Sequence, residues 1–346
     1  MERPRVAVAI VNANSGRFLR RSLAALAEQT RAPDRILVVD NGSTDGSADG
    51  VEAEFPSVEV IRLDANVGFA AANNLAAREA GDSEWLALLN PDAFPEARWL
   101  EELLRAAEAA PGSASFSSRI VMDSDPGRLD AAGDVMHVSG VAWQGGRGES
   151  SSSAAAPREV FSASAAAALY RRDAFLAVGG FDERFFCYYE DVDLGFRLRL
   201  VGHRSMYVPG AVARHVGSSA ACRDSDFMLY HTHRNIVWTY VKDMPSALFW
   251  LYLPQHLLVN LATLAAFAIT RRAGVAFRAK RDALRGLPEI LRERRAVQDR
   301  RVVSSREIRR ALARGRSVVP VLSRRSRELA ATAPTEPAGP PPSRPA

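Results

Sequence analysis

The stretch Leu86-Ala87-Leu88-Leu89-Asn90-Pro91-Asp92-Ala93 is a short apolar run that ends in an acidic turn. Such a run, bounded by turn residues, is typical of a strand buried in a parallel sheet. Open α/β sheets bind their ligands outside the carboxyl ends of the strands, which is where Asp92 would lie. We therefore expect Asp92 to hold a metal ion against a bound diphosphate.

Strand and helix patterns alternate along the first third of the chain. Apolar runs predict strands at residues 5–11, 35–40, 58–63 and 85–89. Apolar residues at helical spacing and helix-start signals predict helices at residues 17–28, 69–80 and 95–109. Regular alternation of this kind predicts an α/β fold, with a mostly parallel sheet flanked by helices.

The ends of the predicted strands carry polar side chains in place of a dinucleotide fingerprint. The first strand is followed by Asn12-Ala13-Asn14-Ser15-Gly16, and no G-x-G-x-x-G occurs there. Polar residues suited to a base, a ribose and a diphosphate stand at successive strand ends: Asn14, Asp40, Asn41, Asn66 and Asp92. Each of them alone is more readily explained as turn chemistry. Their recurrence at one predicted edge favours a ligand site.

Charge is distributed unevenly along the chain. The composition is that of a globular protein, with 47% hydrophobic and 25% charged residues and a net charge of +5. Residues 271–346 contain 20 Lys or Arg against 7 Asp or Glu. A basic block after an apolar segment favours an anionic membrane surface over nucleic acid, with a solvated helical face as the alternative. The two cysteines, Cys187 and Cys222, have no metal-type spacing and are expected to be ordinary thiols.

The middle of the chain lacks clear alternation. Residues 111–160 show no regular period, and residues 140–156 are rich in Gly, Ser and Ala. We predict a mobile loop at residues 140–156, either as a lid on the acceptor side or as an insertion without a role. Short strands are predicted again at residues 205–208 and 211–215.

A second acidic cluster follows a group of aromatic residues. Glu190 and Asp191 begin a predicted helix over residues 190–201. Acids at a helix start also stabilise it by capping and through the helix dipole. That does not explain the aromatic residues just before them, which are Phe185, Phe186, Tyr188 and Tyr189. These rings would make a partly dry pocket for a catalytic base, or a platform for a sugar ring.

The chain resembles the family 2 glycosyltransferases of the GT-A fold, especially their rhamnosyltransferase-like branch, from about residue 5 to about residue 310. Six motifs carry the resemblance in the family's order: Val38-Val39-Asp40-Asn41-Gly42-Ser43, Asn66-Val67-Gly68-Phe69-Ala70, Leu89-Asn90-Pro91-Asp92-Ala93, Gly179-Gly180-Phe181-Asp182-Glu183, Glu190-Asp191-Val192-Asp193-Leu194 and His215. The resemblance implies a GT-A sheet with a nucleotide-sugar site at its edge.

The resemblance also implies roles for single residues. Asp92 would bind the metal, Mg²⁺ or Mn²⁺, and His215, a weak metal candidate by itself, would contact the metal or the diphosphate. Asp191 would be the catalytic base, with Glu190 beside it. Nucleotide-sugar contacts are implied or expected at Asn14, Asp40, Asn41, Asn66 and Asn73. Asn90 replaces the first acid of the family's acid-x-acid metal motif, which removes one charge from the expected metal site.

The implied activity is an inverting, metal-dependent transfer of a sugar from a nucleotide-diphosphate donor. The donor would be dTDP-rhamnose or a UDP-sugar, and the acceptor a lipid-linked or cell-envelope glycan. Two alternatives stay open, a transferase of another hexose and a non-catalytic GT-A module that acts as a membrane-bound binding or scaffold protein. The implied location is the cytoplasmic face of the bacterial inner membrane, as a peripheral protein, or the cytoplasm.

A segment without charged residues, residues 244–270, follows the part that is expected to be catalytic. Its length suffices for a bilayer, which needs ~20 apolar residues. A single crossing would separate a cytosolic donor site from the basic tail, which is also expected in the cytoplasm. We therefore predict an interfacial or re-entrant helical pair, with Trp250 and Tyr252 at headgroup depth, and a buried helical hairpin as the alternative.

These observations divide the chain into three parts. Residues 1–225 are expected to form the GT-A catalytic domain. Residues 226–330 are expected to form a helical, membrane-associating region. Residues 331–346 are rich in proline and are expected to be disordered.

Overall fold

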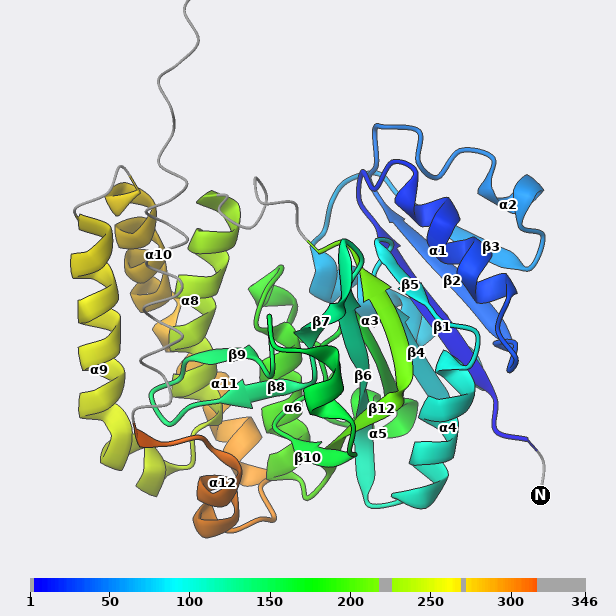
Figure 1. The fold of residues 1–346 in the computed structure, drawn as a ribbon. Helices are drawn as coiled ribbons and strands as arrows, with labels where there is room; N and C mark the ends of the chain where they lie inside the picture. The colour runs from blue at the N-terminus through cyan, green and yellow to red at the C-terminus, as the bar shows by residue number, and fades with distance from the viewer. Residues whose placement is uncertain (1–2, 218–225, 269–271, 316–346) are drawn as a thin grey trace, which may run out of the picture.

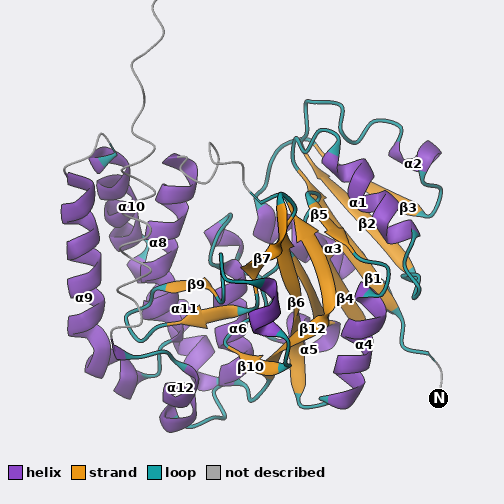
Figure 2. Cartoon of the chain, in the orientation of Figure 1, coloured by secondary structure: helices purple, strands orange, loops and turns teal. Residues whose placement is uncertain are grey.

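The computed structural model describes residues 3–217, 226–268 and 272–315. A ten-stranded mixed sheet lies at the centre, in the order β10-β12-β6-β11-β4-β1-β2-β3, with β5 paired to β12 and β7 paired to β6. Helices cover both faces of the sheet, and further helices from the C-terminal part stand beside it (Figure 1). Figure 2 shows the strands gathered between these groups of helices.

The first half of the sheet is parallel, as predicted. Its strands are β1 (Val6–Asn12), β2 (Arg35–Asn41), β3 (Val58–Leu63) and β4 (Trp85–Leu89). Parallel register places Asn12 opposite Asp40, so the ends of β1 and β2 lie side by side. The connecting helices are α1 (Phe18–Ala27), α2 (Val51–Glu54) and α3 (Phe69–Glu79). Every residue of β1 is buried, as expected for a strand covered on both faces.

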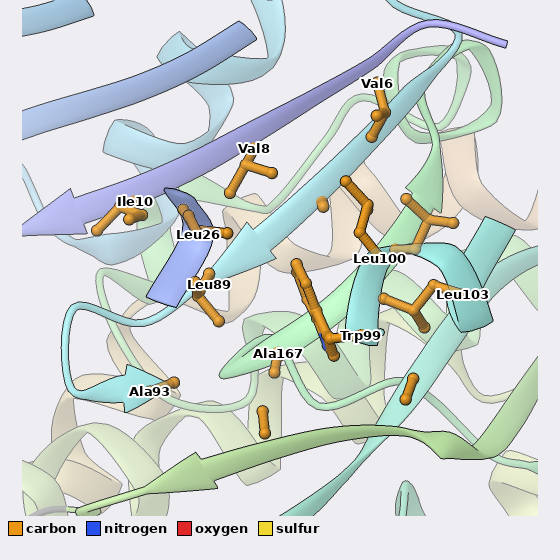
Figure 3. Packing of buried hydrophobic residues seen from close by; sticks show 14 of the residues in the cluster. Val6, Val8, Ile10, Leu26, Leu89, Ala93, Trp99, Leu100, Leu103 and Ala167 are labelled. Carbon is orange, nitrogen blue, oxygen red and sulfur yellow. The ribbon is translucent and has the colours of Figure 1, made fainter. Parts of the chain in front are cut away.

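Two apolar clusters fix the helices to the sheet. On one face, α1 and α4 (Trp99–Ala109) pack Leu26, Trp99 and Leu103 against Val8 and Leu89 (Figure 3). On the other face lie α3, α5 (Arg172–Ala177) and α6 (Glu190–Leu200). These contacts hold the carboxyl ends of β1, β2 and β4 at one edge of the sheet.

The second half of the sheet differs from the sequence prediction. Residues 111–160, which show no period, contain β6 (Ser113–Met122), β7 (Asp125–Ala131), β8 (Asp134–Met136), β9 (Ala142–Gln144) and β10 (Arg158–Val160). Strands of three residues, such as β8, β9 and β10, are too short to show the alternation of apolar and polar residues that predicts a strand. The predicted loop at residues 140–156 holds β9 and a 3-10 helix (Ser151–Ala154).

Two further boundaries are corrected at this end of the sheet. The short strands predicted at residues 205–208 and 211–215 form one strand, β12 (Arg204–His215), with a register shift between Val208 and Val212. Pro95 ends the short strand β5 (Ala93–Pro95) and does not begin the helix after it. β11 (Ala167–Arg171) lies antiparallel between β4 and β6.

Among the residues described after 225, five helices follow: α8 (Asp226–Asp243), α9 (Ser246–Ala268), α10 (Ala273–Arg285), α11 (Leu287–Asp299) and α12 (Ser305–Ala311). Their core is continuous with α6, because Val192 and Phe196 lie in one cluster with Trp238 and Tyr240 of α8. The helices therefore pack directly on the element that begins with Glu190.

The apolar segment forms a single helix over its described residues. α9 continues through Pro254, so the predicted helical pair and the alternative hairpin are both wrong there. Pro254 lies inside α9 and cannot donate a backbone hydrogen bond, but the helix continues on both sides of it. Residues 269–270 of this segment, Cys222, and the proline-rich residues 331–346 lie outside the described residues.

Candidate active site

Asn12, at the end of β1, organises the first polar cluster at the sheet edge. Its Nδ2 donates to Asp40 Oδ1 at 3.0 Å, to Ser43 Oγ at 3.0 Å and to Ser47 Oγ at 2.9 Å. Asn12 is fully buried and Asp40 nearly so. These contacts hold the Asp40 carboxylate in one orientation, as a contact for a nucleobase would require.

The neighbouring amides shape the loops at the strand ends. Asn14 has a left-handed backbone (φ 54°), and its Oδ1 accepts from the Thr44 N–H at 2.8 Å. Asn41 accepts from the Val67 N–H at 2.9 Å and donates to Asn66 Oδ1 at 3.0 Å. Asn14, Asn41 and Asn66 thus gather at one edge, and their direct contact with a nucleotide stays a prediction.

Asn73 is placed differently from these amides. It is 1% exposed, and its Nδ2 donates to the Phe69 carbonyl of its own helix at 2.9 Å. The next residue, Asn74, crosses to another segment and donates to the Phe181 carbonyl at 2.8 Å. The structure therefore does not bring Asn73 into the cluster at the strand ends.

Asp92 and His215 meet at the end of β4. His215 Nε2 lies 3.2 Å from Asp92 Oδ1, and His215 Nδ1 lies 2.8 Å from Asp130 Oδ2. Backbone pairing supports the contact, because the Val216 N–H donates to the Asp92 carbonyl at 3.0 Å. Burial lowers the pKa of His215, but the hydrogen bonds to Asp130 and Asp92 outweigh it and raise the pKa to about 9. His215 is therefore a cation between two carboxylates at neutral pH.

The donor atoms at this position fit a hard divalent cation. The Asp92 carboxylate is 22% exposed at the sheet edge. Asn90 Oδ1 is buried and accepts no hydrogen bond from the described residues. Carboxylate and amide oxygens are the ligands that Mg²⁺ and Mn²⁺ prefer. Within residues 3–217, 226–268 and 272–315, no three His, Cys, Asp or Glu side chains are arranged to hold a metal by themselves. Such a cation would need further oxygens from a ligand.

The second acidic cluster lies at the start of α6. Asp191 accepts from the Ala165 N–H at 3.2 Å and from the Val192 N–H at 2.8 Å. Glu190 is 5% exposed, and its Oε2 has no hydrogen-bond partner among the described residues. Asp191 is therefore held by backbone groups, while Glu190 lies in a drier position beside it.

Asp134 of β8 belongs to the same cluster. It is 5% exposed, and its Oδ2 accepts from Ser162 Oγ at 2.9 Å. Burial, together with the nearby Asp191 carboxylate, raises the pKa of both Asp134 and Glu190 well above ordinary values. Burial also raises the pKa of Asp191, but its two backbone N–H donors oppose the shift. Of the three carboxyl groups, Asp191 is thus the one that ionises most readily.

A short chain of contacts joins the Asp191 cluster to the Asp92 cluster. Asp191 accepts from the Ala165 N–H at 3.2 Å. The next carbonyl, that of Ala166, accepts from the Asn90 N–H at 2.8 Å. Asp92 follows two residues after Asn90. The segment before β11 therefore lies between the two carboxylates, and both stand at the carboxyl end of β4.

Aromatic rings of the segment that precedes Glu190 and Asp191 pack against rings of α8. Phe186 stacks on His231 of α8 with 5.4 Å between ring centroids. Phe227 is 46% exposed and lies 5.9 Å from Phe186 and 6.2 Å from Tyr188 between ring centroids. Exposed aromatic faces beside carboxylates suit the binding of a sugar ring.

Asp193, the last acid of the Glu190-Asp191-Val192-Asp193 motif, has a structural place. It pairs with Arg197 at 2.6 Å and also with the buried Lys242 of α8. Lys242 in turn lies 2.6 Å from Asp182. A cavity of about 520 Å³ beside this network, between α3, α6 and α11, shares no residue with the Asp92 and Asp191 clusters. The network fixes α6 against α8.

Sequence reasoning missed three residues of the site: Asn12 beside Asp40, Asp130 beside His215, and Asp134 beside Asp191. Asn12 had a signal, because it is a polar residue at the end of an apolar strand. Asp130 and Asp134 lie in residues 111–160, which show no regular hydrophobic period. Only the pairing of β7 with β6 and the bridge between Asp134 and Ser162 bring them to His215 and Asp191.

The family model for glycosyl transferase family 2 matches residues 7–179, the part that supplies Asn12, Asp40 and Asp92. The chain belongs to glycosyl transferase family 2. It is therefore a glycosyltransferase. Asp191 and His215 lie beyond the matched residues, in the part where this structure completes the site.

The relatives agree with the rhamnosyltransferase-like branch. N-acetylglucosaminyl-diphospho-decaprenol L-rhamnosyltransferase of Mycobacterium tuberculosis is 31% identical over 266 residues, which cover 69% of this chain and 84% of that protein. O-antigen biosynthesis protein RfbC of Myxococcus xanthus is 29% identical over 233 residues, which cover 64% of this chain and 18% of that protein. The resemblance to this branch of family 2 is thereby confirmed.

Two solved structures of other glycosyltransferases share the fold. GalNAc-T7 with UDP, GalNAc and Mn²⁺ is 15% identical, with a TM-score of 0.57 over 68% of this chain and 47% of that chain. Mannosyltransferase PcManGT from Pyrobaculum calidifontis, in complex with GDP-Man and Mn²⁺, is 19% identical, with a TM-score of 0.52 over 86% of each chain. These likenesses confirm the predicted GT-A fold.

Proposed function

We propose that this glycosyltransferase moves rhamnose from a nucleotide-diphosphate donor to a lipid-linked or cell-envelope glycan, with inversion at the anomeric carbon. The Mycobacterium relative supports rhamnose and a polyprenyl-diphosphate-linked acceptor, since its name states both. The two solved structures were determined with a nucleotide or nucleotide sugar and Mn²⁺, which supports a metal-assisted nucleotide-sugar site. The donor is then dTDP-rhamnose, and a UDP-sugar is the alternative that would change the sugar transferred.

Asp92 and Asn90 would hold the cation, Mg²⁺ or Mn²⁺, at the end of β4. When bound, the cation neutralises charge on the departing nucleoside diphosphate. Asp92 and Asn90 supply two oxygen ligands. His215 lies between Asp92 and Asp130 and would hold the Asp92 carboxylate in place. The nucleoside would lie along the ends of β1 and β2, where Asp40 is held ready for the base.

Asp191 is proposed as the general base, with Glu190 beside it. An ionised Asp191 takes the proton from the acceptor hydroxyl as that oxygen attacks the anomeric carbon. Displacement occurs in one step from the face opposite the diphosphate, which inverts the configuration. Glu190 and Asp134 keep their protons more readily, so a single negative charge in this buried cluster falls on Asp191.

One observation carries the proposal: Asp191 and Asp92 flank the same strand end, joined by the Ala165–Ala166 backbone. The test is a transfer assay with dTDP-rhamnose, Mn²⁺ and a synthetic N-acetylglucosaminyl-diphospho-polyprenol. We expect a rhamnosylated lipid by mass spectrometry, with an inverted anomeric centre by NMR. UDP-glucose and GDP-mannose serve as donor controls. A product formed only from one of these would overturn the rhamnosyl assignment, and no product from any donor would overturn the proposed reaction.

A membrane-facing surface would bring the enzyme to a lipid-linked acceptor. α9 is 23 residues long and by length and composition could cross a membrane. Only 11% of its most apolar window is buried, and Trp250, Leu258 and Leu261 are exposed. The neighbouring α10 exposes three arginines, at positions 278, 281 and 285. We propose that α9 lies in the cytoplasmic surface of the bacterial inner membrane, with the arginines against anionic headgroups.

We therefore propose residues 1–225 as the catalytic domain and residues 226–330, which are described as far as residue 315, as a membrane-associating region. The continuous core of α6 and α8 implies that the two parts fold together. Truncation before α8 would expose that core.

Replacing two exposed leucines of α9 should weaken membrane binding. We expect the double variant Leu258→Glu/Leu261→Glu to lose at least about tenfold in affinity for vesicles that contain phosphatidylglycerol, because charges replace apolar contact in the interface. Cosedimentation with vesicles measures the change. Val302→Glu is the matched control, since Val302 is 74% exposed but lies outside α9. Equal cosedimentation of both variants and the wild type would contradict docking through α9.

A further inference from the structure

Residues 184–189, here called the base loop, lead directly into Glu190 and Asp191. Three of its residues have a left-handed backbone: Phe186 (φ 64°), Tyr188 (φ 68°) and Tyr189 (φ 73°). Residues with bulky side chains rarely adopt this conformation, and it persists only where the surroundings hold it. The position of the base loop therefore depends on contacts from outside the loop.

Asn235 of α8 makes the largest set of these contacts. It is fully buried, and its Nδ2 donates to the carbonyl oxygens of Phe185 at 3.1 Å, Cys187 at 3.1 Å and Tyr188 at 2.7 Å. Arg234 Nε donates to Asn235 Oδ1 at 3.0 Å. Since Oδ1 accepts from Arg234, the amide is oriented with its N–H groups toward the base loop.

The contacts around Asn235 leave little freedom for the loop. Arg234 Nη2 donates to the carbonyls of Arg184 and Phe185, each at 2.9 Å. From the opposite side, the Ala70 N–H of α3 donates to the Phe186 carbonyl at 3.2 Å. A Cβ atom at Gly68 would lie 2.7 Å from the Phe186 ring, so the backbone before α3 touches the base loop directly.

We infer that Asn235 is a positioning residue for the catalytic base: it holds three carbonyls of the base loop and thereby sets where Asp191 meets the acceptor hydroxyl. The inference rests on the proposed function, because it assigns Asn235 a part in that reaction. α8 lies outside the residues that match the family, 7–179. The C-terminal helices thus complete the active site as well as carrying the apolar face of α9.

Variants of Asn235 test the inference against a matched control. Asn235→Leu keeps the approximate shape but has no hydrogen-bond donor in its side chain, and Asn235→Ser keeps one O–H donor in a smaller side chain. Gln298→Ala is the control, because Gln298 also donates an amide N–H to a carbonyl of α8, that of Asp243 at 2.9 Å, but within the described residues makes no hydrogen bond to the base loop. All variants are compared as full-length protein, after thermal melting shows that they are folded.

We expect kcat for rhamnosyl transfer to fall about 100-fold in Asn235→Leu, since small displacements of a catalytic group have effects of this size. Affinity for dTDP with Mn²⁺ should not change. The acidic limb of the kcat–pH profile should move to lower pH, because water that reaches Asp191 removes the burial that raises its pKa. Hydrogen exchange of the amides at residues 185–190 should be faster than in Gln298→Ala. Asn235→Ser should show a smaller fall in kcat and a smaller rise in the exchange rate of these amides.

Equal kcat, pH profile and loop exchange in the Asn235 variants and Gln298→Ala would overturn the inference and leave the proposed reaction intact. Faster loop exchange with an unchanged kcat would also overturn it, because the loop would move without effect on the base. Absence of transfer by the wild type would instead overturn the proposed reaction, and with it the part of Asn235 in catalysis. Hydrogen exchange would still report whether Asn235 holds the loop.

Discussion

Asp191→Asn should abolish sugar transfer and leave nucleotide binding intact. The substitution keeps the size of the side chain and its place against the Ala165 N–H but removes the group that accepts the acceptor's proton. General-base catalysis contributes about 10²- to 10⁴-fold, so kcat should fall within this range. Nucleotide affinity, measured by calorimetry with dTDP and Mn²⁺, should be unchanged because the nucleotide site lies at the ends of β1 and β2.

The pH dependence of the wild type gives a second check on Asp191. The base must be ionised, and burial raises its pKa above the ordinary value of 3.8. Transfer should therefore be lost as the pH falls through this raised pKa, at a higher pH than for a solvated carboxylate. Asp125→Asn, which changes an exposed carboxylate of β7, is the control and should behave like the wild type. Normal turnover in Asp191→Asn would refute the base assignment.

The parallel half of the fold was predictable because its strands carry a strong local signal. β3 and β4 begin and end where the apolar runs predict, and β1 and β2 differ by one residue. Buried parallel strands are continuous apolar runs, so their ends are visible in the sequence. Polar residues at those ends, such as Asp40 and Asp92, could be predicted as candidate site residues for the same reason.

The second half of the site depends on packing between distant segments. Asp134 reaches Asp191 only because β8 pairs beside Ser162, and three-residue strands leave no periodic signal. Asn235 reaches the base loop from 47 to 50 residues away, through the packing of α8 on α6. The course of α9 was mispredicted because the helical pair was inferred from the expected location of the donor site and the basic tail, whereas the segment forms one helix that continues through Pro254.

Asp92→Asn should remove metal-dependent nucleotide binding, and transfer with it. The amide preserves the shape at the end of β4 but lacks the negative charge that a divalent cation requires, and Asn90 has already replaced one acid of the motif. A cation that neutralises a leaving diphosphate contributes several kcal/mol, so transfer should fall about 10²- to 10³-fold. Calorimetry of UDP or dTDP with and without Mn²⁺ measures the loss of the metal-dependent part.

Asp123→Asn provides a closely matched control for Asp92→Asn. The Asp123 side chain is 21% exposed against 22% for Asp92, and its backbone N–H donates to the His215 carbonyl. Its carboxylate, however, pairs with Arg21 on the surface. The metal response is the gain in nucleotide affinity when Mn²⁺ is added. Its loss in Asp92→Asn but not in Asp123→Asn would assign the cation to Asp92. A full metal response in Asp92→Asn would instead refute the assignment of the cation to Asp92.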